Sequence, residues 1–162
     1  MKYSIIYNSQ TGNTAQLAKA IQANITGEIE YFGPIKDVDS EVLFIGFWTN
    51  KGNCSDEMTT YLKSLNHKSI FLFGTCGFGE SSQYFDKIIE NVKKHINNTN
   101  TVIGSYMCQG QMPMTVRDRY VKMAKENPQR FQPMIDNFDK ALSHPNQNDL
   151  NNLIQAIKKT AV

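Results

Sequence analysis

The residues best able to bind a ligand are three hydroxyl side chains around a glycine, in the stretch Ser9-Gln10-Thr11-Gly12-Asn13-Thr14. This stretch lies between a β-branched and aromatic segment, residues 3–7, and a segment with helical spacing of apolar residues from about Thr14. A helix N-terminus offers unpaired backbone N–H groups and the positive end of the helix dipole. Together with hydroxyl donors, these groups would bind a phosphate without a lysine. The alternative is that the hydroxyls only cap the helix.

Two later loops contain residues suited to hold a flat aromatic ligand. They are Trp48-Thr49-Asn50-Lys51-Gly52-Asn53-Cys54 and Thr75-Cys76-Gly77-Phe78-Gly79-Glu80-Ser81-Ser82. Trp48 is the single tryptophan, and an aromatic ring at this place would stack on a ligand ring. The glycines would let the backbone approach that ring closely. The alternatives are a tryptophan that caps the core and glycines that serve turn geometry alone.

Known catalytic motifs and the other common phosphate-binding motifs are absent from the sequence. There is no GxxxxGK[ST] loop, and Gly77-Phe78-Gly79 lacks the third glycine of a dinucleotide fingerprint because Ser82 stands in its place. The three histidines are isolated, and no acid/base pair, catalytic triad or metal-ligand cluster is apparent. We therefore expect no catalytic residue and no metal site.

The three cysteines, Cys54, Cys76 and Cys108, are odd in number and widely spaced. They match no disulfide framework or metal-ligand spacing, so we expect reduced thiols. Each falls in or beside a loop that ends an expected strand, which suggests a shared redox role for the thiols. The alternative, which we favour, is that they are small buried packing residues.

The hydrophobic pattern predicts five strands that alternate with helices. The strands are expected at residues 3–7, 28–32, 42–47, 69–74 and 101–108. The third and fourth are uninterrupted apolar runs, as in central strands covered on both faces, whereas the second alternates as an edge strand does. Short connections between strands and helices favour parallel βαβ units. The expected fold is an open, doubly wound α/β sheet.

No strand signal follows Pro113; instead, three helices are expected at about residues 116–125, 131–142 and 150–157. One of these helices should complete the fold. The others would form a helical insertion or appendage at about residues 113–145. We expect a single domain over residues 1–162, because no linker or repeat divides the chain.

Charge and hydropathy exclude several classes of function. The net charge is +2, but residues 28–90 hold five lysines and ten acidic residues, while residues 91–162 hold ten basic and five acidic ones. This separation suggests docking surfaces of opposite sign, and the scattered bases do not form a nucleic-acid stripe. No run approaches the ~18 to 20 apolar residues of a membrane span, and the start resembles a strand and not a signal peptide. We expect a cytoplasmic protein that binds neither nucleic acid nor membrane.

The stretch Ser9–Thr14 resembles the T/S-x-T-G-x-T phosphate loop of the flavodoxin family, and the two later loops occur in that family's order and spacing. The resemblance covers about residues 1–108. It implies FMN as cofactor and a five-stranded parallel sheet of order 2-1-3-4-5, with the ligand at the switch between the first and third strands. The implied FMN-binding residues are 9–14, Trp48 to Gly52 and Thr75 to Gly79.

The resemblance also implies an electron carrier whose partners are an electron-donor protein and an acceptor reductase. Gly46-Phe47-Trp48-Thr49, the run from Gly104 to Gly110, and Ala141-Leu142-Ser143-His144-Pro145 resemble flavodoxin-like proteins that accompany bilirubin reductases. This implies a reductase acting on a tetrapyrrole. Two alternatives stay open: an FMN-dependent NAD(P)H oxidoreductase, and a binding module that has lost the flavin.

Overall fold

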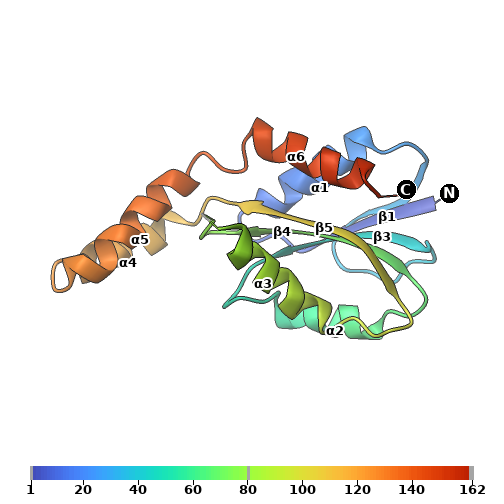
Figure 1. The fold of residues 1–162 in the computed structure, drawn as a ribbon, viewed down its shortest axis with the longest axis horizontal. Coiled ribbons are helices and arrows are strands. Elements are labelled where there is room, and N and C mark those ends of the chain that lie inside the picture. Colours follow the sequence, from blue (N-terminus) through green and yellow to red (C-terminus); the bar gives the residue numbers. More distant parts are fainter. Residues whose placement is uncertain (1, 80, 161–162) are drawn as a thin grey trace.

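The computed structural model describes residues 2–79 and 81–160, so that residues 1, 80, 161 and 162 lie outside it. Five strands form one parallel sheet in the order β2-β1-β3-β4-β5 (Figure 1). Their bounds are β1 Lys2–Tyr7, β2 Glu28–Gly33, β3 Val42–Trp48, β4 Ser69–Cys76 and β5 Thr101–Gln109. The strand order reverses between β1 and β3, as predicted. In such a sheet, ligands bind beyond the carboxyl ends of the strands at that reversal.

Four helices cover the two faces of the sheet. Figure 1 shows α1 (Asn13–Asn24) and α6 (Gln147–Lys158) on one face, and α2 (Asp56–Ser64) and α3 (Ser82–Lys93) on the other. Successive side chains of a strand point to opposite faces, so a strand covered on both faces is apolar throughout. This explains the uninterrupted apolar runs of β3 and β4, whose residues are almost all fully buried.

Each face has its own hydrophobic core. On the first face, Leu17, Ile21 and Leu153 from the helices pack with phenylalanines of β3 and β4. On the second face, Met58 and Ile88 pack with Leu43, Leu72 and their neighbours in the same two strands. The two cores fix the sheet and so hold the loops at its carboxyl edge in place.

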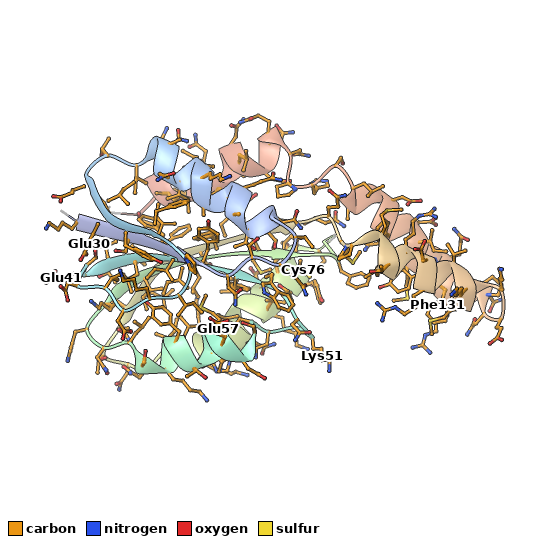
Figure 2. All side chains as sticks on the ribbon, turned by 180° about the vertical axis from the view of Figure 1, so that it is seen from behind. Glu30, Glu41, Lys51, Glu57, Cys76 and Phe131 are labelled. Carbon is orange, nitrogen blue, oxygen red and sulfur yellow. The ribbon has the colours of Figure 1, made fainter. Side chains whose placement is uncertain are left out.

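The remaining helices, α4 (Met114–Ala124) and α5 (Pro128–Ala141), form a hairpin between β5 and α6 that projects from the sheet (Figure 1). Figure 2 places Phe131 in this hairpin, at the end of the molecule opposite Glu30 and Glu41. Phe131 packs against Tyr120, with 6.4 Å between ring centroids, and Arg117 Nε donates to Asp139 Oδ1 at 2.8 Å. Thus α6 covers the sheet together with α1, while α4 and α5 lie outside the two layers of helices.

The three C-terminal helices begin two or three residues earlier than their apolar spacing predicted. Polar caps account for two of these starts: the Asn127 side chain accepts from the Arg130 N–H, and Asn146 forms a capping box with Asp149. Caps lie outside the apolar repeat, which is why periodicity alone places the start too late. None of the described helices is long and apolar enough to cross a membrane.

Candidate ligand-binding site

The loop between β1 and α1 turns sharply at Gly12, whose φ of 89° lies in the left-handed region that glycine tolerates best. The Ser9 hydroxyl oxygen accepts from the backbone N–H groups of Gly12 at 3.1 Å and Ala15 at 3.4 Å. Among the described residues, none accepts a hydrogen bond from the N–H of Asn13 or Thr14. Two unpaired donors therefore remain at the positive end of the α1 dipole, where an anion is favoured.

The Thr14 side chain is buried, with 1% of its surface exposed. Its hydroxyl donates to the Phe47 carbonyl oxygen at 3.2 Å and lies 3.2 Å from the Thr75 hydroxyl oxygen. These contacts join α1 to the ends of β3 and β4. The Thr14 side chain thus holds the loop in place, while its backbone N–H has no acceptor among the described residues.

A cavity of about 70 Å³ lies where the ends of β1, β3 and β4 meet. It brings together eight of the residues predicted to bind a ligand: Gln10, Thr11, Asn13, Trp48, Thr49, Thr75, Cys76 and Gly77. The Thr49 hydroxyl oxygen is buried here and has no hydrogen-bond partner in the described part of the chain. Because buried hydroxyls are normally hydrogen-bonded, the Thr49 hydroxyl is a group that a polar ligand atom could satisfy.

Asn50, Lys51 and Gly52 do not line this cavity. They form a tight turn in which Asn50 and Asn53 exchange backbone hydrogen bonds of 2.7 and 3.1 Å. Lys51 and Gly52 both have positive φ, at 52° and 78°, as the two central residues of such a turn require. The Gly52 carbonyl oxygen accepts from the Asn91 side chain at 2.9 Å, so the turn is anchored to α3.

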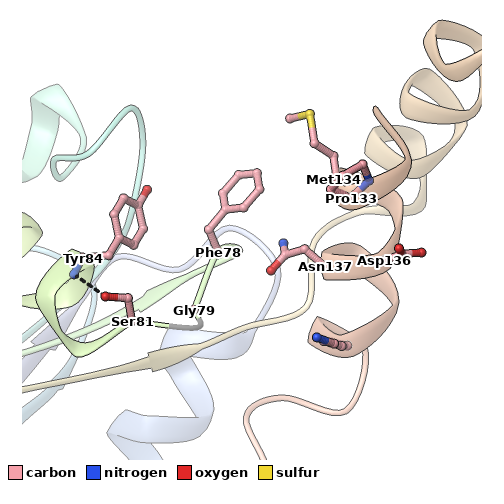
Figure 3. A pocket seen from close by; sticks show the side chains of 9 residues that line it. Phe78, Gly79, Ser81, Tyr84, Pro133, Met134, Asp136 and Asn137 are labelled. Atoms are coloured by element: carbon pink, nitrogen blue, oxygen red, sulfur yellow. Dashed lines mark hydrogen bonds between the residues drawn. The ribbon is translucent and has the colours of Figure 1, made fainter. Parts of the chain in front are cut away.

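A second and larger cavity, of about 600 Å³, lies between the loop after β4 and helix α5 (Figure 3). Phe78 and Gly79, which the sequence grouped with Trp48, line this cavity instead. Figure 3 shows the Phe78 ring between Tyr84 and α5, with the Tyr84 N–H donating to Ser81 Oγ at 3.4 Å. Partial burial raises the pKa of the Tyr84 phenol to about 12. The α5 side of the cavity consists of Pro133, Met134, Asp136, Asn137 and Lys140.

A small polar network attaches the hairpin to the loop after β4. The Gly77 carbonyl oxygen accepts from the side-chain amides of Gln109 and Asn137, both at 3.0 Å. The Gln109 amide also donates to the Asn137 side-chain oxygen at 3.1 Å. Sequence reasoning missed the α5 residues, because nothing in an amphipathic pattern tells which loop a helix will face.

The three cysteines are buried free thiols. Cys54 and Cys76 belong to one hydrophobic core and Cys108 to the other. Burial raises the pKa of the Cys54 and Cys108 thiols, which keeps them in the unreactive protonated form. These surroundings favour the packing role over the redox role. Within residues 2–79 and 81–160, no group of three His, Cys, Asp or Glu side chains could hold a metal ion.

Known proteins with similar sequences belong to a family with this fold. Residues 4–158 match the family model of the flavodoxin domain. Two relatives are each named flavodoxin-like domain-containing protein BilS. The one from Clostridium symbiosum (strain WAL-14163) is 38% identical and the one from Clostridioides difficile (strain CD3) is 31% identical. Each alignment covers 93% of this chain and 90% of the relative.

Solved flavodoxins share the fold at much lower identity. A short-chain flavodoxin associated with a non-canonical PDU bacterial microcompartment superposes with a TM-score of 0.58 at 14% identity, covering 98% of this chain and 95% of that one. Oxidised flavodoxin 1 from Bacillus cereus has a TM-score of 0.55 at 16% identity, with 99% and 100% covered. With its strand order, its loop at the start of α1 and its match over residues 4–158, the chain belongs to the flavodoxin family.

Proposed function

We propose that this chain binds FMN at the carboxyl ends of β1, β3 and β4, and that it carries electrons between a donor protein and an acceptor reductase. The observation that supports this most directly is the pair of unpaired N–H groups at Asn13 and Thr14. Asn13 lines the same cavity as Trp48 and Thr49, and Thr14 follows it in the first turn of α1. Anion donors next to an aromatic surface suit a phosphate joined to a flat ring.

The loop Ser9–Thr14 would hold the phosphate through its N–H groups and the side chains of Thr11 and Asn13. Trp48 and the backbone of Thr75–Gly79 would hold the isoalloxazine ring. Offset stacking of two aromatic rings contributes about 0.5 to 1.5 kcal/mol in addition to the free energy of burying their surface. FMN would supply the redox chemistry. The protein would contribute position, exclusion of water and the electrostatics around the ring.

The acceptor is proposed to be a reductase that acts on a tetrapyrrole such as bilirubin. This rests on the resemblance carried by Gly46–Thr49, by Gly104–Gly110 and by Ala141–Pro145. The projecting α4–α5 hairpin is an additional surface beside the site that a partner could contact.

An absorbance titration of the apoprotein with FMN, followed by anaerobic stepwise reduction, tests the proposal. We expect stoichiometric binding and reduction in two resolved one-electron steps. Thr49→Val should weaken FMN binding, because it removes the orphaned hydroxyl while keeping the shape of the side chain. Thr60→Val, at an exposed position on α2, is the matched control. A chain that stays colourless with excess FMN would refute the proposal and favour a flavin-free binding module.

A second candidate is an FMN-dependent NAD(P)H oxidoreductase. The cavity of about 600 Å³ beside Phe78 favours it, because a hydride donor needs space next to the flavin loops. Rapid bleaching of the bound flavin by NADPH alone, with no partner protein, would establish this activity. Flavin that is reduced only when a donor protein is added would support the carrier.

A further inference from the structure

Four residues between β5 and α4, Gly110–Pro113, lie across the smaller cavity and form one of its walls. We call this segment the strap. The Gln111 carbonyl oxygen accepts from the Asn13 side-chain amide at 2.7 Å and from the Thr11 hydroxyl at 3.4 Å. Both donors belong to the loop at the start of α1. A backbone oxygen of the strap therefore already uses side-chain donors that a phosphate oxygen would need.

The strap also packs closely against the opposite side of the cavity. A Cβ atom built on Gly77 would come within 2.5 Å of the Met112 sulfur, so the Met112 side chain lies directly on the backbone at Gly77. Two backbone hydrogen bonds hold the strap: the Gly110 N–H donates to the Cys76 carbonyl at 2.9 Å, and the Gln111 N–H to the His144 carbonyl at 3.0 Å.

The strap accounts for the small size of the cavity. Sites for cofactors and drug-sized molecules usually measure ~300 to 1,000 Å³, far above the roughly 70 Å³ available here. The other walls are the loops after β1, β3 and β4, which are fixed by the two hydrophobic cores. The strap is held mainly by exchangeable hydrogen bonds and one methionine, so it is the wall that can move at the lowest cost.

We propose that the strap is an intramolecular occupant of the flavin site, and that FMN binding displaces it. In the closed state the Gln111 carbonyl oxygen takes the place of a phosphate oxygen on Asn13 and Thr11. The inference rests on the proposed FMN binding and goes beyond it in one respect. Because α4 begins at Met114, directly after the strap, displacement must also shift the α4–α5 hairpin, so loading of the site is coupled to the position of a projecting surface.

Hydrogen exchange measured by mass spectrometry, with and without saturating FMN, tests the displacement. Bound FMN should slow exchange in the loop at residues 9–16. In contrast to the usual effect of a ligand, it should speed exchange of the Gly110 and Gln111 amides, because their hydrogen bonds to Cys76 and His144 are lost. Tight FMN binding that leaves these two amides unchanged or better protected would overturn the inference while leaving the proposed electron carrier intact.

FMN affinity of strap variants provides the second test. If only a fraction of the molecules has an open strap, the apparent affinity for FMN is the intrinsic affinity multiplied by that fraction. Loosening the strap should therefore raise the apparent affinity. Met112→Ala removes the packing on Gly77 and should bind FMN about tenfold more tightly, as expected for the loss of a partly buried methionine side chain. Met123→Ala, on an exposed part of α4, is the matched control and should bind as the wild type does. Equal affinities for wild type and Met112→Ala would contradict the strap, and a failure of all three proteins to bind FMN would overturn both proposals.

Discussion

Replacing Thr14 by valine separates a structural role for this residue from a role in holding a ligand. The substitution keeps the branched shape of a residue that is 1% exposed, but it removes the hydroxyl that contacts both the Phe47 carbonyl and the Thr75 hydroxyl at 3.2 Å. Losing one member of a buried hydrogen-bonded set leaves the others unsatisfied, which costs about 1 to 3 kcal/mol. We expect the free energy of unfolding to fall by about 2 kcal/mol in the absence of any ligand.

Urea denaturation of the apoprotein, followed by circular dichroism, measures this loss. Thr14→Ser, which keeps the hydroxyl, should retain more stability than Thr14→Val. The double variant Thr14→Val with Thr75→Val should lose much less than the sum of the two single losses, because it removes both hydroxyls of the pair. If Thr14→Val unfolds at the wild-type urea concentration, or if the two losses simply add, the hydroxyl does not join α1 to the sheet as we describe.

Three further outcomes follow from the packing and burial of other residues. Gly46→Ala should lower the free energy of unfolding by about 1 to 3 kcal/mol in urea, because its Cβ would lie 2.4 Å from the Phe73 ring; wild-type stability would contradict this contact. Burial lowers the pKa of His95 from 6.5, so below that pH the unfolded chain binds the proton more readily and stability should decline as the pH falls from 7 to 5. His95→Gln should flatten that decline in pH-dependent melting, and an equally steep decline in the variant would assign it to other groups. The three cysteines should resist iodoacetamide in the native protein and react once it is unfolded in urea, whereas fast native labelling would show that a thiol is accessible.

The elements of the sheet could be predicted from short stretches of the sequence. The apolar runs of β3 and β4 indicate strands covered on both faces, and the alternation in β2 indicates an edge strand. Successive side chains of a strand point to opposite faces, so their polarity shows which faces are buried. The loop at residues 9–14 could be recognised in the same way. Its hydroxyls and glycine stand at a helix start, where local geometry alone orients the N–H groups.

The grouping of the site residues was only partly predictable. Trp48, Thr49 and Thr75 meet the first loop because parallel strands end at one edge of the sheet. Phe78 also follows the end of a strand, but it lines the larger cavity, together with Pro133 and Met134 of α5. No local sequence pattern predicts that α5 packs beside this loop. The turn at Lys51 and Gly52 is held against α3 by a contact with Asn91, 39 residues away in the chain.

Local sequence patterns were enough to predict which segments form the sheet, that residues 9–14 connect the first strand to a helix, and that helices follow the last strand. All three follow from periodicity and from residue types that act over a few positions. The contact of Gly110–Pro113 with the loop at residues 9–14 is visible in the tertiary structure alone, because the hydrogen bond from Asn13 to Gln111 joins residues 98 positions apart. Such long-range pairings depend on how separate elements pack against one another, and this packing governs how much space the site leaves for a ligand.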